Sequence, residues 1–495
     1  MKKDRREFLI NSCSALTMVA LATQMRHFGL MSAMAQTSKR SRAAALPSDY
    51  RALVCIFLSG GNDSNNMIVP NHSSGSVSNY AAYSSLRSTQ GLALAQASLL
   101  PISVPRIGGL TYGLHPNLGP LATGGINNGI HELWAQGRLG AVTNVGTLVA
   151  PTTRTQYLNN TVKKPYQLFS HSDQVNQYQG GRSDTQPFSG WAGRISDLRS
   201  GLDNPNGLVP MITSISGAQL FTSGQSTLPL TIADSNTLLS NVLNPQGFTT
   251  NNGPARKTSF DQLRSYDLDK DIIKAASEVT TEAMLANSAL QTNPTLTTTF
   301  PTNTSIGRQL MQVARMISKR NELGVTRQIF FVQLGGFDTH TNQLTGQGTL
   351  MGQLGQAMRA FYDEMAAQGL SDKVTQFTMS DFNRTMNPAG SGASVGSDHA
   401  WGGHCLVLGG GLVGADFYGV NASNGTPFQT LTLNGPDDSD SGTSARGRWV
   451  PTASIEQYAA TLARWFGVPE TSMSTVFPRL PYFSSSNLGF MQPPA

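Results

Sequence analysis

Short apolar runs that end in glycine or in a polar cluster dominate the hydrophobic pattern of this 495-residue chain. Such runs are typical of strands covered on both faces of a sheet, because a half-exposed strand would alternate apolar and polar positions. The pattern predicts strands over residues 52–58, 139–145, 328–334, 374–379 and 405–408.

Helical periods lie between these runs. One predicted helical face carries Leu350, Leu354, Met358, Phe361 and Met365, and Gly369 is placed as its C-terminal end. Ser454 and Gln457 have the spacing of a capping box, which opens a second helix that Gly467 closes. Alternating strands and helices predict an α/β domain around a mostly parallel sheet.

The stretch from about residue 204 to 304 has a different composition. It is rich in Ser, Thr, Asn and Gln, and shows one clear helical period, over residues 269–290. We interpret it as a polar insertion or cap on a domain that spans residues 36–495.

Residues 1–35 have the features of an export signal. A charged start precedes a short apolar run, Ala15 to Ala22, and Ala33-Met34-Ala35 provides a small-x-small cleavage site. Arg5-Arg6-Glu7-Phe8-Leu9 matches the twin-arginine signal of bacterial export. We therefore expect the twin-arginine translocase as a partner and a periplasmic or extracellular location.

Composition agrees with export. Only 13% of residues are charged, about half the roughly 25% of an average soluble domain. Without residues 1–35 the formal net charge of +6 falls close to neutral, and no cluster of Lys and Arg interleaved with aromatic residues remains, which argues against a nucleic-acid partner. No later apolar run is long enough for a membrane span.

The cysteines exclude one type of metal site. Cys13 belongs to the signal, while Cys55 and Cys405 lie in apolar runs. Two buried free thiols are expected in preference to a disulfide, and a metal site built from cysteines is excluded by number.

Acidic and histidine side chains collect where the predicted strands end. In open α/β sheets, ligands gather at the carboxyl ends of strands, where loops from several strands meet. Oxygen and imidazole donors from separate strand ends are what a catalytic divalent ion needs, here Zn, Mn, Mg or Ca. The candidate ligands are Asp63, Asp338, His340, Asp381, Asp398, His399 and His404.

Each candidate also has a structural interpretation. Asp63, like any Asp after a strand, is equally suited to cap a helix or to form a turn. His404 borders an apolar run and suits a hydrogen-bonded core position, and an Asp-x-His pair is a common loop sequence.

A hydroxyl nucleophile is predicted in "FSHSDQVNQ". Ser170, with His171 beside it, could present its hydroxyl to a metal-bound substrate. The same Ser could cap a helix that starts near Asp173, and Thr152, Thr153 and Thr155 are rival hydroxyls. "GGND" at residues 60–63 is similar to the oxyanion-hole block of SGNH esterases, but no Gly-Asp-Ser motif precedes it.

Motifs along nearly the whole chain resemble one bacterial family, the twin-arginine-exported domain of unknown function 1501. They are "RREFL", "LVCIFLSGGNDSNNMIVP", "YGLHPNLGPL", "GRLGAVTNVG", "FSHSDQVNQYQGG", "GWAGRISDL", "LGGFDTHTNQ", "MSDFNRT" and "GSDHAWGGHCLVLGGGLVGADFYG". Two positions depart from the family's pattern, because Asp381 stands where Glu is more frequent and Ser172 where Phe is usual.

The resemblance implies an alkaline phosphatase-like or sulfatase-like fold, a three-layer α/β/α sandwich. It also implies a metal centre drawn from the candidate ligands, a nucleophile at Ser170, and hydrolysis or transfer at phosphate or sulfate esters.

Two functions follow as hypotheses. The first is an exported metal-dependent hydrolase that acts on a small-molecule or polysaccharide ester. The second is a non-catalytic cell-envelope binding or assembly protein on the same fold, which the neutral Ser/Thr/Asn-rich surface favours. An SGNH-like esterase is a distant third.

Overall fold

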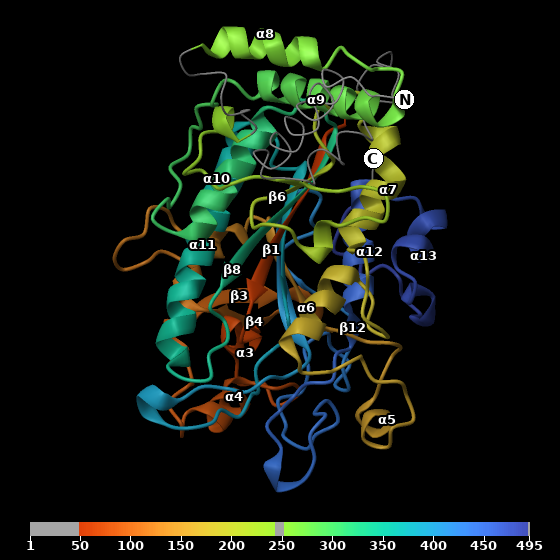
Figure 1. Cartoon of the computed structure of the whole chain (residues 1–495). Helices are drawn as coiled ribbons and strands as arrows, with labels where there is room; N and C mark the ends of the chain where they lie inside the picture. Colours follow the sequence, from red (N-terminus) through yellow and green to blue (C-terminus); the bar gives the residue numbers. More distant parts are fainter. Residues whose placement is uncertain (1–48, 243–251, 494–495) are drawn as a thin grey trace.

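A nine-stranded sheet forms the centre of the computed structural model, which describes residues 49–242 and 252–493 (Figure 1). The strand order is β11-β5-β10-β9-β1-β8-β6-β7, and β12 also pairs with β5. The predicted signal at residues 1–35, with Cys13, lies outside the described residues.

The five predicted strands are all present in this sheet. They are β1 (Arg51–Ser59), β5 (Leu139–Gly146), β8 (Arg327–Gly335), β9 (Val374–Ser380) and β10 (Gly403–Gly409). The edges are completed by β6 (Ile212–Ser214), β7 (Leu230–Thr231), β11 (Phe417–Tyr418) and β12 (Ala453–Ser454). All pairings are parallel except those of β10, which runs antiparallel to both β9 and β5.

The reversal of β10 decides which residues share an edge. Gly403, the first residue of β10, pairs with Val145 near the end of β5. Residues that precede β10 therefore lie at the same edge as residues that follow β1, β8 and β9. This edge is called the carboxyl edge below.

Helices cover both faces of the sheet, which makes a three-layer α/β/α sandwich (Figure 1). Along β1, Val54 and Ile56 pack into one hydrophobic cluster, while Cys55 and Phe57 pack into another on the opposite face. The first cluster is covered by α10 (Ser305–Ser318) and α11 (Gln343–Ala367), and the second by α7 (Trp191–Asp203) and α12 (Ile455–Phe466). Burial on both sides explains why the strand sequences lack alternation.

Smaller elements surround this sandwich. A second sheet has the order β2-β4-β3, with β2 (Ile68–Pro70), β3 (Leu100–Val104) and β4 (Leu110–Leu114). The remaining helices are α3 (Ser64–Met67), α4 (Tyr80–Arg87), α5 (Arg154–Leu158), α6 (His171–Gly180), α8 (Gly253–Leu263), α9 (Asp271–Ala289) and α13 (Met473–Val476).

The predicted helix ends are confirmed. Ser454 and Gln457 form a capping box at the start of α12, and Gly467 ends that helix with φ +116°. Gly369 has φ +70° just beyond α11. The helix predicted over residues 269–290 is α9.

The polar stretch contributes β6 and β7 to the central sheet, while its helices α8 and α9 lie far from the carboxyl edge. Figure 1 places α8 and α9 at one end of the molecule, and α3, α4 and α5 at the other. Thr292, which follows α9, accepts a hydrogen bond of 2.6 Å from Lys319 at the end of α10, and the neighbouring Arg320 stacks on Tyr50, which precedes β1. The part of the stretch that follows α9 therefore borders the amino end of β1.

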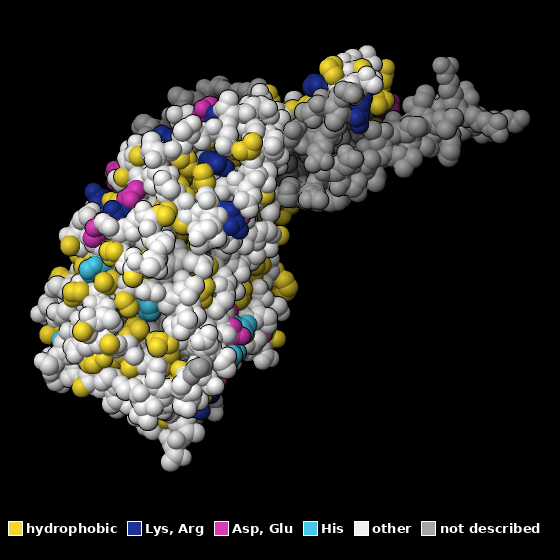
Figure 2. All heavy atoms as spheres, turned by 90° about the vertical axis from the view of Figure 1, so that its left-hand side faces the viewer, with side chains coloured by type: hydrophobic (Ala, Val, Ile, Leu, Met, Phe, Trp, Pro, Cys, Tyr) yellow, Lys and Arg dark blue, Asp and Glu magenta, His cyan; other side chains and the backbone are white. Residues whose placement is uncertain are grey.

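The state of the two thiols and the distribution of charge on the surface match what the sequence predicted. Cys55 and Cys405 are buried and free. Figure 2, which views the side of α10 and α11, shows scattered charged side chains among neutral atoms. Among the described residues, no helix combines the length and apolar character that crossing a membrane requires.

Glu456 is a buried carboxyl in the first turn of α12. Its Oε2 atom accepts a 2.8 Å hydrogen bond from the Arg479 backbone N–H, while Oε1 has no hydrogen-bond partner. Burial raises the pKa of Glu456 to about 8, against the smaller opposing effects of that hydrogen bond and of the Arg194 charge.

We expect Glu456→Gln to flatten the dependence of stability on pH. The folded protein keeps the Glu456 proton that the unfolded chain releases above its ordinary pKa near 4.5, so stability falls as pH rises from there to about 8. The amide has no such loss. In urea unfolding, the free energy of unfolding of the variant, relative to that of the wild type, should rise by a few kcal/mol between pH 5 and pH 9. Equal slopes for the two proteins would contradict this assignment.

Candidate metal centre

Titratable side chains from four separate segments meet at the carboxyl edge. Asp338 and His340 follow β8, Asp381 follows β9, His399 precedes β10, and His171 is the first residue of α6. The sequence predicted each of these residues for the site, His171 as the neighbour of the nucleophile. The structure brings them together although His171 and His399 are 228 residues apart in the sequence.

Three of these side chains form a group that could hold a metal ion. One donor atom from each of His171, Asp338 and His399 lies within 4.8 Å of the other two. The Oδ1 atom of Asp338 is 3.4 Å from His171 Nε2 and 3.6 Å from His399 Nε2. We call these three residues the triad.

Both triad imidazoles are oriented through their other ring nitrogen. His171 Nδ1 lies 2.7 Å from Asp381 Oδ2, and His399 Nδ1 lies 2.9 Å from the carbonyl oxygen of Phe169. An imidazole held in this way through Nδ1 presents Nε2 to the centre, as in many metal sites. His171 Nε2 is also buried without a hydrogen-bond partner, so a donor atom is directed at the centre and left unused.

The two imidazoles have opposite protonation tendencies. The hydrogen bond that Asp381 accepts from His171 raises the pKa of His171 against the effect of burial, and the charges of Asp381 and Asp338 raise it further. Burial lowers the pKa of His399, and the nearby cations lower it further. His399 is therefore the imidazole that is more readily neutral, which is the form that binds metal.

Asp338 is the exposed member of the triad, with half of its side chain accessible. Burial acts to raise its pKa, but the hydrogen bond and charge of Arg384, with the charges of His171 and His340, hold the pKa below its ordinary value. Asp338 therefore stays a carboxylate at neutral pH.

The ring of Phe382 forms an apolar support under the triad. Its centroid is 4.6 Å from the centroids of both His171 and His399. Gly61 makes room for this ring, because a Cβ atom at Gly61 would lie 2.5 Å from a Phe382 ring carbon.

Phe169 holds a strained backbone next to the site. It has φ +73°, a backbone conformation that residues other than glycine rarely adopt. This turn aims the Phe169 carbonyl at His399 and starts α6 at His171. Strain that serves such a contact is frequent at functional sites.

Two further candidates border the triad. His340 Nε2 is 3.1 Å from Asp338 Oδ1 and 3.2 Å from His399 Nε2, and its Nδ1 is 3.5 Å from Asp398 Oδ1. His340 is thus placed to join the triad as a further donor, while Asp398 contacts it from outside.

Asp63 and His404 lie apart from the triad. Asp63 is buried, caps α3, and binds Arg87 through both carboxylate oxygens, at 2.7 and 3.0 Å. His404 is buried beside Phe428 and accepts a 3.1 Å hydrogen bond from the Asn144 backbone at Nδ1. Burial lowers the pKa of His404 to about 3. These environments match the structural interpretations, and the ligand roles of both residues stay predictions.

Ser170 occupies the N-cap position of α6, but its side chain does not cap the helix. Its hydroxyl instead donates a 2.6 Å hydrogen bond to Asp173 Oδ2. Among the rival hydroxyls, Thr153 caps α5 and Thr152 donates to the Ala150 carbonyl. Ser170 therefore keeps a carboxylate partner that could accept its proton.

Sequence reasoning missed Phe169, Phe382 and Arg384. The motif "SDFNR" drew attention to Asp381 alone, although the three residues after it also build the edge. A Phe and an Arg two positions apart, shortly after a strand, were the available signal for Phe382 and Arg384.

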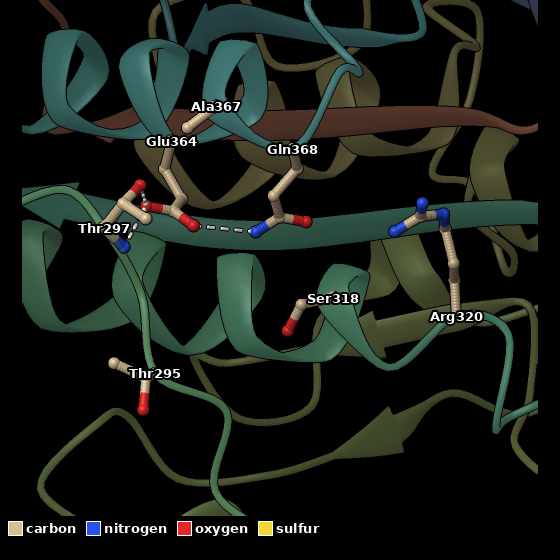
Figure 3. A pocket seen from close by; sticks show the side chains of 7 residues that line it. All are labelled: Thr295, Thr297, Ser318, Arg320, Glu364, Ala367 and Gln368. Atoms are coloured by element: carbon tan, nitrogen blue, oxygen red, sulfur yellow. Dashed lines mark hydrogen bonds between the residues drawn. The ribbon is translucent and has the colours of Figure 1, made fainter.

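A surface cavity of about 300 Å³ lies elsewhere, lined by Thr295, Thr297, Ser318, Arg320, Glu364, Ala367 and Gln368 (Figure 3). Glu364 Oε2 already accepts hydrogen bonds from the backbone N–H groups of Thr297 and Thr298, at 3.0 and 2.9 Å. The cavity borders the ends of α10 and α11 and the amino end of β1, so the strand length of about 30 Å separates it from the triad.

The fold and the site together define an α/β/α sandwich with a possible His/Asp metal site at its carboxyl edge. The chain belongs to the family described as "Protein of unknown function (DUF1501)", which matches residues 50–430. This match confirms the family expected from the motifs. A search of curated proteins gave no match.

Solved structures with similar architecture include metal-binding proteins. A TAB5 alkaline phosphatase mutant with Mg bound, from an Antarctic bacterium, has 8% identity and a TM-score of 0.27, over 77% of this chain and 95% of that one. The C-terminal periplasmic domain of EcEptC from Escherichia coli, in complex with Zn, has 10% identity and a TM-score of 0.27, over 74% and 77%.

The PsFucS1 sulfatase from Pseudoalteromonas sp. has 8% identity and a TM-score of 0.26, over 81% of this chain and 68% of that one. Similarity at these TM-scores carries no argument about the activity of this chain. The three-layer arrangement stands on the sheet and helices described above.

We expect Gly61→Ala to damage the site more than Gly91→Ala. Both glycines have nearly equal positive φ, +83° and +85°, but a Cβ atom meets Phe382 at Gly61 and nothing within 4 Å at Gly91. The shared backbone strain costs about 1–2 kcal/mol, and overpacking at Gly61 adds about 1–3 kcal/mol. Thermal unfolding measures this difference, and equal losses in the two variants would refute the contact.

Proposed function

We propose that this protein is an exported, metal-dependent hydrolase of phosphate or sulfate esters. The observation that carries the proposal is the triad. In it, His171 Nε2 is buried, has no hydrogen-bond partner and lies 3.4 Å from Asp338 Oδ1. Two imidazoles and one carboxylate are a donor set of catalytic zinc sites, which keep a further position open for substrate or water.

The donor set fits some ions better than others. Imidazole suits Zn²⁺, whereas Mg²⁺ and Ca²⁺ prefer oxygen donors. We therefore place Zn²⁺ first among Zn, Mn, Mg and Ca. When bound, such an ion supplies Lewis-acid polarisation of an ester oxygen.

The chain's own residues prepare this chemistry. Asp381 and the Phe169 carbonyl hold the two imidazoles in place, and Phe382 excludes water from beneath them. Half-exposed Asp338 leaves the centre open to solvent on one side, where a substrate can enter.

Ser170 is the proposed nucleophile. It lies one residue before His171, and Asp173 Oδ2 accepts its hydroxyl hydrogen at 2.6 Å. Asp173 is thus placed to take the proton when the Ser170 oxygen attacks phosphorus or sulfur. The bond from phosphorus or sulfur to the alcohol oxygen of the substrate breaks, the alcohol leaves, and a phosphate or sulfate ester of Ser170 remains. Water hydrolyses this ester in a second step, which releases phosphate or sulfate and restores the Ser170 hydroxyl.

The non-catalytic alternative has one supporting observation. Ser170 sits at a helix N-cap, a position that serine fills in many proteins without catalytic work. In that case the protein would use the same edge to bind a cell-envelope component.

The SGNH alternative finds no support in the "GGND" block. Asn62 is buried, and its side-chain amide donates to Met67 Sδ at 3.4 Å. An oxyanion hole needs its donor directed at the substrate.

We expect Asp338→Asn to lower the turnover of an aryl phosphate or aryl sulfate at least 100-fold. The change removes the anionic donor of the triad and retains its shape. Asp261→Asn, a carboxyl on α8 at the far end of the molecule, is the matched control and should retain turnover. Steady-state kinetics on zinc-supplemented protein measure both, and equal turnover in the two variants would refute the triad.

Ser170→Ala separates catalysis from binding. In the hydrolase, this variant keeps its zinc and loses turnover. A wild-type protein that is folded, free of zinc and inactive on both ester classes would favour the envelope-binding function.

Export is expected to depend on the arginine pair. Replacing both, Arg5→Lys with Arg6→Lys, should hold the protein in the cytoplasm, because the translocase reads the two arginines together. Cell fractionation measures the location, and Lys2→Arg with Lys3→Arg is the control. Unchanged export of the first variant would refute the twin-arginine route.

A further inference from the structure

Two buried arginines stand among the acids of the carboxyl edge. The side chains of Arg87 and Arg384 are both fully inaccessible, and each forms an ion pair with a candidate metal ligand. A buried cation is costly unless anions and hydrogen-bond acceptors surround it. These two arginines therefore mark the acids that already have a buried cation beside them, which are Asp63 and Asp338. The two acids differ in exposure, because Asp63 is fully buried and Asp338 is half exposed.

Arg87 neutralises Asp63. Its two terminal nitrogens bind the two Asp63 oxygens, and its Nε donates to the Met386 carbonyl at 3.0 Å. Gln343 and Asn65 donate to the same carboxylate, at 2.6 and 3.2 Å. Every oxygen of Asp63 is thus engaged inside the protein.

Arg384 occupies the space between the loops. Its donors reach the carbonyls of Gly61 at 3.0 Å, Ser397 at 3.0 Å, Gly60 at 2.6 Å and Phe337 at 3.1 Å. Its Nη2 also contacts Asp338 Oδ1. The contact with Asp338 places the guanidinium directly beside the triad, and its Nη1 is 3.5 Å from the neighbouring His340 Nε2.

Asp381 is engaged as well. Both of its oxygens accept from the Gly60 backbone N–H, at 3.1 and 3.2 Å, and Oδ2 also contacts His171. Of the acids that follow β1, β8 and β9, only Asp338 has half of its side chain exposed toward solvent.

We propose that the guanidinium groups of Arg87 and Arg384 stand at this edge in place of further metal cations. The centre then takes a single divalent ion, which binds at the triad. Arg384 is the residue that positions Asp338 for that ion. A second ion among Asp63, Asp338 and Asp381 would have to displace a guanidinium and leave its carbonyl partners without a donor. This inference rests on the proposed metal centre and adds its stoichiometry and a positioning residue.

The first test is the zinc content of the wild-type protein. Isothermal titration with Zn²⁺, checked by elemental mass spectrometry after dialysis, should give one equivalent per chain, and His399→Ala should give none. Two equivalents at the wild-type centre would overturn the inference and leave the proposed hydrolase standing. No zinc at all would overturn the proposed metal centre itself.

The second test addresses the arginines. The double change Asp63→Asn with Arg87→Gln removes both buried charges together, and it should keep one equivalent with an affinity within about threefold of wild type. Loss of that equivalent from a folded variant would make Asp63 a ligand and overturn the assignment.

Arg384→Lys keeps the charge and loses the forked geometry. It should weaken zinc binding about 10–100-fold, the usual effect of losing an outer partner of a ligand, at unchanged stoichiometry. Unchanged affinity would show that Arg384 does not position Asp338. Circular dichroism establishes folding, and the wild-type stoichiometry decides the inference if this variant does not fold.

Discussion

The guanidinium of Arg384 is the contact on which the carboxyl edge depends. It bonds to carbonyls from the loops that follow β1 and β8 and from the segment that precedes β10. Loops at strand ends are mobile unless something holds them. A cation buried among their carbonyls does so, because each carbonyl that moved away would leave the charge less compensated. Through these carbonyls, Arg384 ties together the segments that carry Asp338, His340 and His399.

Around that contact, the site is organised before any ligand arrives. The orienting partners of the two triad imidazoles come from different segments, Asp381 after β9 and Phe169 before α6. The positive φ of Phe169 shows that the fold sustains local strain to place this carbonyl. Such pre-arranged donors bind an ion without a further loss of conformational freedom.

The triad and the helices of the polar stretch lie at opposite ends of the molecule. Helices α8 and α9 of the polar stretch lie toward the amino end of β1, which the surface cavity of Figure 3 also borders. The triad is bordered instead by residues near Phe169 and by Arg448, which donates to the His399 carbonyl at 2.7 Å and stacks on Phe169. These neighbouring loops therefore surround the triad, and α8 and α9 lie away from it.

The elements that local pattern defines were predictable from the sequence. Five strands and the ends of α11 and α12 followed from apolar runs, a capping box and glycines, because each depends on residues a few positions apart. The site was predictable in part, since strand ends in an α/β sheet attract ligands, and this brought Asp338, His340, Asp381 and His399 forward together.

Tertiary structure decided which of those residues meet. The antiparallel course of β10 places His399, which precedes its strand, beside residues that follow theirs. Asp63 carries the same local signal as Asp338, and each pairs with a buried arginine, yet Asp63 is fully buried and Asp338 stays half exposed. No local pattern contains this difference, because it arises from contacts such as that of Arg384 with Gly60, 324 residues away in the chain. The compensation of a buried charge depends on all the groups that surround it, and only the folded chain determines which groups these are.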